Sequence, residues 1–322
     1  MLYKNNDVQL HKLGLGCGGR MSNDHNKEEK IATIHEALEY GINHLNTADF
    51  YGSGKSELII GEALKGQKRE QAYVSVKFGM LTAPNGGMYG LDVRPLAIKN
   101  YLTYTLKRLN LDYIDLYQPA RIDLGIPVEE TIGAVADLVK AGYVRQIGVS
   151  QVDADTLRKA NSVHPISFVE MEYSLFNRSI EHDIMPTARE LGIGVVAFGA
   201  LAHGLLSGTC SKDSETHSPW VPLFFEQNID RNLELVEQLR TIADEKHVTV
   251  PQLALAWMLT KGEDLITIIG ASRRTTLQDS LKAVNVKLSA DDIQKIETAV
   301  SPEKIAGNSF PNMKFRNGVA AV

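Results

Sequence analysis

Short apolar segments rich in β-branched residues alternate with longer segments of helical periodicity along almost the whole chain. Apolar runs of about four to eight residues are typical of strands, and apolar positions spaced three and four apart are typical of helices. We predict eight strands, at 12–17, 42–48, 73–79, 113–119, 144–150, 167–175, 194–201 and 265–271. We predict helices between and after them, at 27–40, 55–65, 95–109, 128–142, 154–161, 184–192, 233–247, 251–262 and 276–284.

This alternation predicts an α/β fold in which parallel strands are joined by crossover helices. Eight such units without a linker or a change of composition favour a closed (β/α)8 TIM barrel over an open sheet. We therefore expect one barrel domain over residues 1–322, with a C-terminal tail from about residue 301. In such a barrel the functional groups lie where the strands end and the βα loops begin.

The composition, 43% hydrophobic and 23% charged, is that of a globular protein. A formal net charge of −5 without a basic stripe argues against nucleic acid and anionic membranes as partners. The sequence shows neither an apolar run long enough to span a bilayer nor a signal peptide. Cys17 and Cys210 are too few for a disulfide framework, and no histidine spacing predicts a metal site. We expect a cytoplasmic protein.

Three glycines near the N-terminus, Gly14, Gly16 and Gly19, match the GxGxxG fingerprint of Rossmann domains. That fingerprint requires an apolar strand before the first glycine and a helix directly after the last. Here the glycines begin inside the predicted strand, and a loop continues to about Lys27. We therefore interpret them as glycines that let the first βα loop approach a ligand closely.

The second predicted strand ends in Asn46-Thr47-Ala48-Asp49-Phe50-Tyr51-Gly52, which resembles the D-T-A-x-x-Y-G motif of the aldo-keto reductase family. Further matches to that family follow in order up to about residue 300: SVKFG with Lys77, GVS at 148–150, EYSL at 172–175, RELGIGVVAFGALAHGLLSG at 189–208 and IIGAS at 268–272. The resemblance implies a barrel enzyme that uses NADPH to reduce a small aldehyde or ketone by hydride transfer.

The resemblance assigns catalysis to Tyr51 and Lys77. Hydride reduction of a carbonyl needs a proton donor beside the developing alkoxide. A phenol is a reluctant acid at neutral pH, but a neighbouring ammonium group stabilises the phenolate. Tyr51 and Lys77 follow adjacent strands and would form such a pair. Taken singly, either residue would be an ordinary loop or strand-end side chain.

Two catalytic positions depart from the family pattern. The family's aspartate, which neutralises the lysine, is replaced by Asn46, and its histidine, which orients the carbonyl, is replaced by Ala120. We expect Asn46 to accept a hydrogen bond from Lys77 but to leave the lysine charge unpaired. Arg121 is a candidate substitute for the histidine as a carbonyl donor. The alternative is an ion pair between Arg121 and a nearby acid, Asp115 or Asp123.

These departures, together with E-x-E-Y-S-L-F at 170–176, resemble the pyridoxal reductase branch of the family. The resemblance suggests an active enzyme with a variant site, and pyridoxal, reduced to pyridoxine, as the substrate.

The resemblance also assigns residues to the NADPH cofactor. It places the nicotinamide ring on Tyr173 and the carboxamide against Ser150, Gln151 and Glu170. A carboxylate at 170 can accept from the carboxamide NH2 but cannot donate to its oxygen. The loop 199–208 would lie along the pyrophosphate. Further cofactor candidates are Cys17, expected at the pocket mouth, and Gly18, Ala200, Leu201, Gly204 and Asp279.

The segment 270–276 (GASRRTT) opens the last barrel helix, and helix N-termini bind phosphate through unpaired backbone N–H groups. Ser272 and Arg273 match the family positions that hold the 2′-phosphate, and Arg274 adds a second positive charge. Two arginines here favour NADPH over NADH. The alternative is a solvated arginine pair, although cations at a helix start oppose its dipole.

Two other functions stay open. An NADPH-binding regulatory or sensor subunit with slow chemistry, similar to potassium-channel β subunits, is compatible with the missing aspartate and histidine. A phosphate-binding isomerase or aldolase would share only the fold and would use Lys77 as a base or Schiff-base residue. Among the remaining features, 219–225 (PWVPLFF) is either a lid or a packing patch. We expect His203 to contact ligand and His44 to be a core residue.

Overall fold

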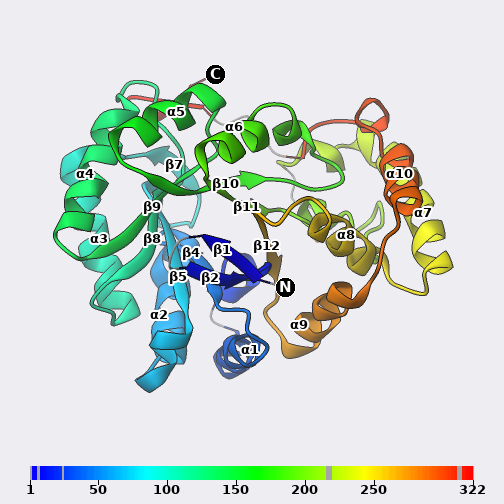
Figure 1. Ribbon diagram of the computed structural model, residues 1–322, viewed down its shortest axis with the longest axis horizontal. Coiled ribbons are helices and arrows are strands. Elements are labelled where there is room, and N and C mark those ends of the chain that lie inside the picture. Colours follow the sequence, from blue (N-terminus) through cyan, green and yellow to red (C-terminus); the bar gives the residue numbers. More distant parts are fainter. Residues whose placement is uncertain (1, 6–7, 24, 215–219, 310–313, 322) are drawn as a thin grey trace.

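Eight parallel strands close into a barrel in this computed structural model, which describes residues 2–5, 8–23, 25–214, 220–309 and 314–321 (Figure 1). Around the barrel the strands follow the order β10-β11-β12-β3-β4-β5-β8-β9. Their bounds are β3 Leu13–Gly16, β4 His44–Ala48, β5 Tyr73–Phe78, β8 Ile114–Pro119, β9 Val144–Ser150, β10 Ile166–Glu172, β11 Gly194–Phe198 and β12 Leu265–Gly270. The predicted (β/α)8 fold is confirmed, and a closed barrel excludes the Rossmann alternative.

The helices surround the barrel (Figure 1). They are α1 Lys27–Glu39, α2 Lys55–Ala63, α3 Pro95–Leu109, α4 Val128–Lys140, α5 Ala154–Val163, α6 Ile184–Leu191, α7 Glu226–Glu245, α8 Val250–Leu259, α9 Arg274–Leu281 and α10 Ala290–Ala299. The helix α3 has the predicted bounds because a proline fixes its first turn and Asn110, in the left-handed conformation, ends it. Of these α-helices, all within the described residues, α10 is the one that was not predicted. Among the described residues, no helix has the length and apolar character required to cross a membrane.

An N-terminal hairpin that the sequence did not predict closes the barrel at the end where the strands begin. Strand β1 (Leu2–Asn5) pairs antiparallel with β2 (Val8–His11). Tyr3 and Leu10 are buried in the barrel interior and form a cluster with Phe168. The hairpin packs closely against β11, because a Cβ added to Gly194 would lie 2.5 Å from the Tyr3 hydroxyl.

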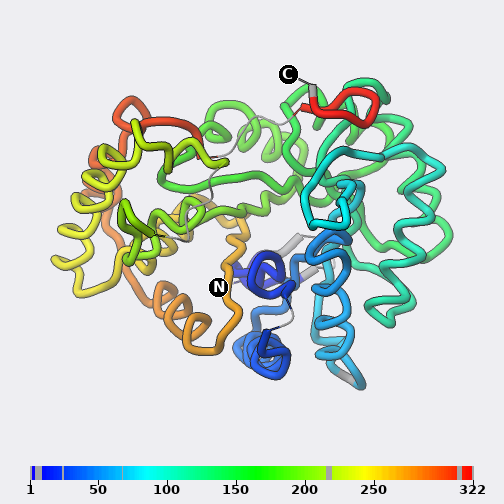
Figure 2. Tube along the Cα trace, turned by 180° about the vertical axis from the view of Figure 1, so that it is seen from behind, coloured from blue at the N-terminus to red at the C-terminus, as the bar shows by residue number. Residues whose placement is uncertain are grey.

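The C-terminal tail lies at the opposite end of the barrel. Its hairpin, β13 (Lys314–Arg316) and β14 (Val319–Ala321), lies beside the hairpin β6 (Met80–Thr82) and β7 (Met88–Leu91) (Figure 2). The Leu91 amide donates to the Gly318 carbonyl at 2.9 Å, and the Leu124 amide donates to the Phe315 carbonyl at 2.7 Å. The tail is therefore held against the loops that follow β5 and β8.

Two glycines of the GxGxxG match, Gly14 and Gly16, have a packing role. A Cβ on Gly14 would lie 2.6 Å from the side chain of Ile268, and a Cβ on Gly16 would lie 2.8 Å from it. Both glycines are thus needed for close packing within the barrel wall. They do not form a ligand loop, which corrects that part of the interpretation.

Candidate active site

Lys77 lies in a buried polar network inside the barrel. Its Nζ donates to Oδ1 of Asn46 at 2.6 Å and to Oε1 of Glu170 at 2.9 Å. Strand pairing of β4 with β5 brings Asn46 near, whereas Glu170 reaches Lys77 from β10. The hydrogen bond to Asn46 was predicted and is present. The expectation of an unpaired lysine charge is wrong, because Glu170 supplies a carboxylate.

Both carboxylate oxygens of Glu170 are engaged. While Oε1 pairs with Lys77, Oε2 accepts from Nδ2 of Asn46 at 2.7 Å and from Nε2 of Gln118 at 2.5 Å. Burial acts to lower the pKa of Lys77, but the charge of Glu170 and then that of Tyr51 outweigh it. The pKa of Lys77 is therefore raised, and the side chain carries its charge at neutral pH.

Tyr51 lies in the loop after β4, three residues beyond its last residue Ala48, and is close to Lys77. The Lys77 ammonium is 5.3 Å from the centroid of the Tyr51 ring. The ring packs directly on Gly18, where an added Cβ would lie 2.9 Å from it. After the tyrosine the chain turns through Gly52, which has φ +58 and no room for a side chain because the Ser22 carbonyl lies against it. The two predicted catalytic residues are thus brought together, and Gly18 has a steric role beside them.

Ala120, directly after β8, is buried, and its methyl side chain has no hydrogen-bonding group. Arg121 follows it, and its Nη1 donates to the Ala120 carbonyl at 2.6 Å. The two acids considered as alternative partners of Arg121 are engaged elsewhere. Asp115 pairs with Arg69 at 2.8 Å, and Asp123 accepts from backbone amides of the tail.

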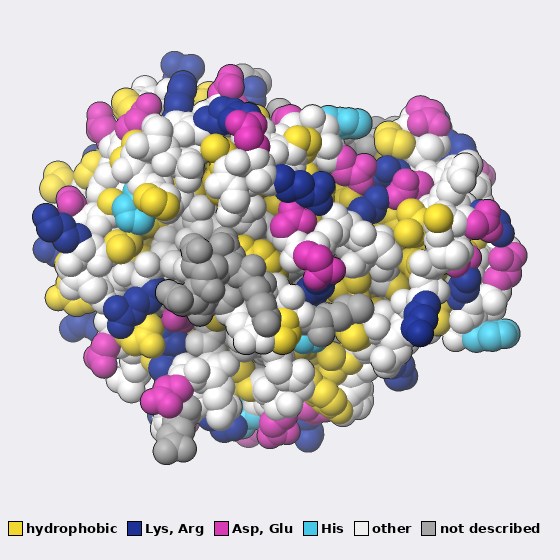
Figure 3. All heavy atoms as spheres, viewed as in Figure 1, with side chains coloured by type: hydrophobic (Ala, Val, Ile, Leu, Met, Phe, Trp, Pro, Cys, Tyr) yellow, Lys and Arg dark blue, Asp and Glu magenta, His cyan; other side chains and the backbone are white. Residues whose placement is uncertain are grey.

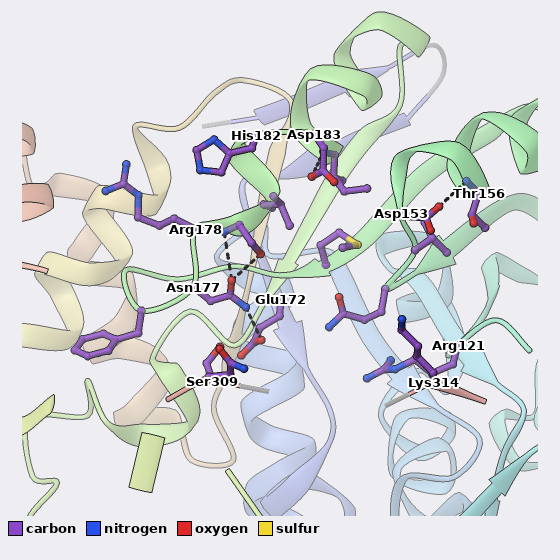
Figure 4. A pocket seen from close by; sticks show the side chains of 18 of the residues that line it. Arg121, Asp153, Thr156, Glu172, Asn177, Arg178, His182, Asp183, Ser309 and Lys314 are labelled. Carbon is purple, nitrogen blue, oxygen red and sulfur yellow. Dashed lines mark hydrogen bonds between the residues drawn. The ribbon is translucent and has the colours of Figure 1, made fainter. Parts of the chain in front are cut away.

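A cavity of about 1030 Å3 opens beside the network, between the loops after β8, β9 and β10 and the C-terminal tail. Arg121, Gln151 and Glu172 line it, whereas Tyr51 and Lys77 are not among its lining residues. Figure 4 shows Arg121 and Lys314 together on one side of the cavity. The C-terminal tail also contributes residues to the lining of this cavity: Pro302, Ile305, Gly307, Asn308, Ser309 and Lys314. The tail therefore forms part of the cavity wall.

Comparison with known proteins agrees with this geometry. The model of the aldo/keto reductase family matches residues 12–301. The chain belongs to this family. Its members are oxidoreductases that act on small carbonyl compounds with a nicotinamide cofactor.

Three relatives illustrate the similarity. The chain is 37% identical over 310 residues to "Probable aldo-keto reductase 1" of Glycine max, covering 94% of this chain and 89% of that protein. A glycerol dehydrogenase from Gluconobacter oxydans has a similar structure, with a TM-score of 0.83, 28% identity and coverage of 94% of this chain and 96% of its own. The holo form of an aldo-keto reductase from Bacillus halodurans is also similar, with a TM-score of 0.77 and 29% identity. The match covers 94% of this chain and 96% of that chain.

The residues expected around the nicotinamide differ in how accessible they are. Ser150 is buried, and among the described residues its Oγ has no hydrogen-bond partner. Gln151 lines the cavity and has a left-handed backbone conformation, with φ +52. Its backbone N–H donates to the backbone carbonyl of Glu170 at 3.0 Å. Such strained residues cluster at functional sites. Of the two residues, Gln151 alone lines the cavity, whereas Ser150 is buried.

Tyr173, the expected stacking surface, is completely buried. Its ring lies 5.4 Å from that of Trp257, and its hydroxyl donates to Glu181 at 2.5 Å. Stacking requires an exposed face, so the structure does not support this role for Tyr173. At the end of the adjacent strand β11, Phe198 is only partly buried. Sequence reasoning missed it, although it is an aromatic residue ending the seventh predicted strand.

Cys17 does not face the pocket mouth, which corrects that expectation. It is buried in the hydrophobic core, and its thiol donates to the Leu15 carbonyl at 3.7 Å. Burial raises the pKa of the thiol to about 12. The side chain is therefore a neutral packing group.

The loop 199–208 is a compact series of turns. The amides of 202 and 204–207 donate to carbonyls of the loop itself, so they are not directed at a pyrophosphate. Ala200 is buried, Leu201 is partly exposed, and Gly204 has φ +100. His203, expected to contact ligand, has φ +56 and pairs with Glu172 at 3.2 Å. The structure gives His203 the role of holding this loop against β10.

At the start of α9 the two arginines differ. Arg274 pairs with Glu29 of α1 at 3.0 Å, and its backbone amide donates to the same carboxylate at 2.9 Å. Arg273 is the exposed N-cap residue, with the partly exposed Ser272 before it. Asp279 accepts a hydrogen bond from Gln252 of α8 at 2.8 Å. Of the two arginine charges, that of Arg273 is the more accessible to a phosphate.

The remaining features are structural. Val221 and Leu223 are buried, which favours packing over a lid for the described part of 219–225, and Pro219 lies outside the described residues. His44 is a core residue as expected, with neither ring nitrogen hydrogen-bonded to a described residue. Burial lowers the pKa of His44 to about 4. The described residues contain no cluster of acidic, cysteine and histidine side chains fit for a metal.

Proposed function

We propose that this protein reduces a small aldehyde with NADPH and that Tyr51 supplies the proton. The position of the buried, charged Lys77 at 5.3 Å from the Tyr51 ring carries this proposal. When bound, the cofactor supplies the hydride. Tyr51 then gives its hydroxyl proton to the carbonyl oxygen, and the ammonium of Lys77 stabilises the phenolate that is left.

The residues of the network fit a nicotinamide. Two buried oxygens, Ser150 Oγ and Gln118 Oε1, have no partner among the described residues, and buried polar groups are ordinarily hydrogen-bonded. A carboxamide offers one acceptor and two donor hydrogens. The Ser150 hydroxyl would donate to its oxygen, and Gln118 Oε1 would accept from its NH2. Phe198 would lie beside the ring, and Arg273 would bind the 2′-phosphate that distinguishes NADPH.

Arg121 would replace the family's histidine as the donor to the substrate carbonyl. Burial lowers its pKa, although a guanidinium still stays charged. It lines the cavity beside Gln151 and Glu172, so a substrate there would meet its N–H groups. The departures at Asn46 and Ala120 favour pyridoxal as the aldehyde, through the resemblance to the pyridoxal reductase branch.

The two alternatives are less compatible with these contacts. A regulatory subunit with slow chemistry was suggested by the missing aspartate, but Glu170 now pairs with Lys77. A Schiff-base or general-base lysine must be neutral to react, whereas the pKa of Lys77 is raised. The observations therefore favour a reductase.

The test is NADPH consumption by the purified protein with pyridoxal, with a simple aromatic aldehyde and without substrate. Saturable turnover of pyridoxal above both comparisons is expected. Because one relative is a glycerol dehydrogenase, glycerol with NADP+ tests the reverse direction. Tight NADPH binding without turnover of any of these compounds would overturn the proposal and support the regulatory subunit.

A further inference from the structure

We infer that Glu170 of β10 is the carboxylate that positions the catalytic lysine, Lys77. The family's aspartate position on β4 contributes only the neutral amide of Asn46. The inference rests on the proposed reductase function. It changes the role of Glu170 from a cofactor contact to a positioning residue that acts through Lys77.

The contacts around Lys77 carry the inference. Lys77, Asn46 and Glu170 form a closed triangle of hydrogen bonds of 2.6, 2.7 and 2.9 Å. All three residues are at most 4% exposed. Within this triangle Glu170 is the only acid, and Asn46 accepts from the ammonium and donates to the carboxylate. A buried lysine charge is tolerated only when it is paired and hydrogen-bonded.

The same contacts leave Glu170 little capacity for a cofactor. An ionised carboxylate only accepts hydrogen bonds, and both oxygens of Glu170 already accept from protein side chains. Among the described residues, the nearby buried oxygens without a hydrogen-bond partner belong to Ser150 and Gln118 instead. These contacts suggest two separate tasks: Glu170 holds Lys77, and Ser150 of β9 and Gln118 of β8 would hold the nicotinamide carboxamide.

The residue types at 46 and 170 depend on each other. A glutamine at 170 with Asn46 retained would leave Lys77 as an unpaired buried charge. An aspartate at 46 with Glu170 retained would place two carboxylates about 2.7 Å apart, where the amide of Asn46 now bridges. Exchanging both residues restores one acid and one amide, because Asn46 Oδ1 is already 2.6 Å from the ammonium.

The exchange is therefore the test, with Glu170→Gln, Asn46→Asp and the double variant compared with the wild type. We expect each single variant to lose about tenfold or more in kcat, which corresponds to ~1.4 kcal/mol. The double variant is expected to recover to within about threefold of the wild type. A double variant no better than Glu170→Gln would overturn the inference.

The pH profile distinguishes positioning from a merely structural role. Burial alone lowers the pKa of Lys77, and the charge of Glu170 is the largest influence opposing it. Glu170→Gln should therefore move the alkaline limb of kcat/KM to lower pH, and the double variant should move it back. A larger Kd for NADPH with an unchanged pH profile would instead assign Glu170 to the cofactor and refute the inference.

A matched control and a stability measurement complete the design. Glu172→Gln removes another buried glutamate of β10, one bonded to His203 and Asn177, so Asn46→Asp should not rescue it. Thermal unfolding of the same variants needs no activity: Tm should fall by about 5 °C in Glu170→Gln and recover in the double variant. If Tm recovers in the double variant but the wild type shows no turnover, the proposed reductase function is refuted, whereas the pairing of Glu170 with Lys77 is supported. Absence of recovery in an active protein would refute the pairing alone.

Discussion

The ammonium of Lys77 lies 5.3 Å from the centroid of the Tyr51 ring, although 25 residues separate the two positions in the chain. Tyr51 lies in the loop after β4, and Lys77 lies near the end of the adjacent parallel strand β5. Gly18 packs against the ring, and Glu170 fixes the ammonium from β10. The proposed proton donor is therefore positioned by groups from three other places in the barrel: Gly18, Lys77 and, through Lys77, Glu170.

The two arginines at the start of α9 should differ in their effect on cofactor choice. Arg273→Ala is expected to raise the Kd for NADPH about tenfold or more, because it removes an accessible cation from the 2′-phosphate. Arg274→Ala should have a smaller effect, since its charge is already paired with Glu29. NADH binding, measured by fluorescence titration, is the control. Equal losses for NADH and NADPH would refute the assignment to the 2′-phosphate.

Restoring the family histidine at position 120 should damage the protein. Ala120 is 1% exposed and belongs to the hydrophobic core, so a larger polar side chain would overpack it. Overpacking costs about 1–3 kcal/mol. We expect Ala120→His to lower both Tm and turnover, with Ala120→Ser as a milder comparison. A stable Ala120→His variant that reduces a wider range of aldehydes would show that the site has room for the histidine.

The tail should depend on Asp123. Its Oδ1 accepts from the amides of Gly125 and Asn317 at 2.7 Å, and its Oδ2 accepts from the amide of Gly318 at 2.6 Å. Asp123→Ala leaves these amides without their acceptor, at a cost of about 1–3 kcal/mol. The tail should then be cleaved faster by protease, and KM should rise about threefold or more. Arg316→Ala, an exposed change in the same hairpin, should leave both unchanged.

His44 should make stability depend on pH in the acid range. Its pKa in the folded protein is about 4, below the ordinary 6.5, because it is buried. Stability is therefore fully present above pH 6.5 and is lost as the pH falls toward 4, because the unfolded chain takes up the proton first. The contribution is about 3 kcal/mol. His44→Phe should flatten this part of the curve relative to the wild type, whereas the exposed His25→Gln should not.

The sequence was sufficient for the barrel and for part of the site. Parallel strands bring their carboxyl ends together, so motifs at predicted strand ends located Tyr51, Lys77 and Asn46 correctly relative to one another. The pairing of Lys77 with Glu170 could not be read in this way. It joins strands on different sides of the barrel, and the two residues are 93 positions apart in the chain.

Burial explains the other differences. Tyr173 was chosen as the aromatic residue within a family motif, but the side chains of Trp257 and Glu181 cover it. Phe198, which ends the next strand, is the more accessible ring. The hairpins at both termini have strands of three or four residues, too short to give a periodic signal. Their positions depend on contacts with the barrel.

The most direct test of the account compares the wild type with Tyr51→Phe for NADPH consumption with pyridoxal, and measures NADPH binding in parallel. We expect the wild type to turn over pyridoxal and the variant to lose about 100-fold or more in kcat, because general acid catalysis contributes about that much. The Kd for NADPH should be almost unchanged. Equal turnover by the two proteins would contradict the assignment of Tyr51 as proton donor.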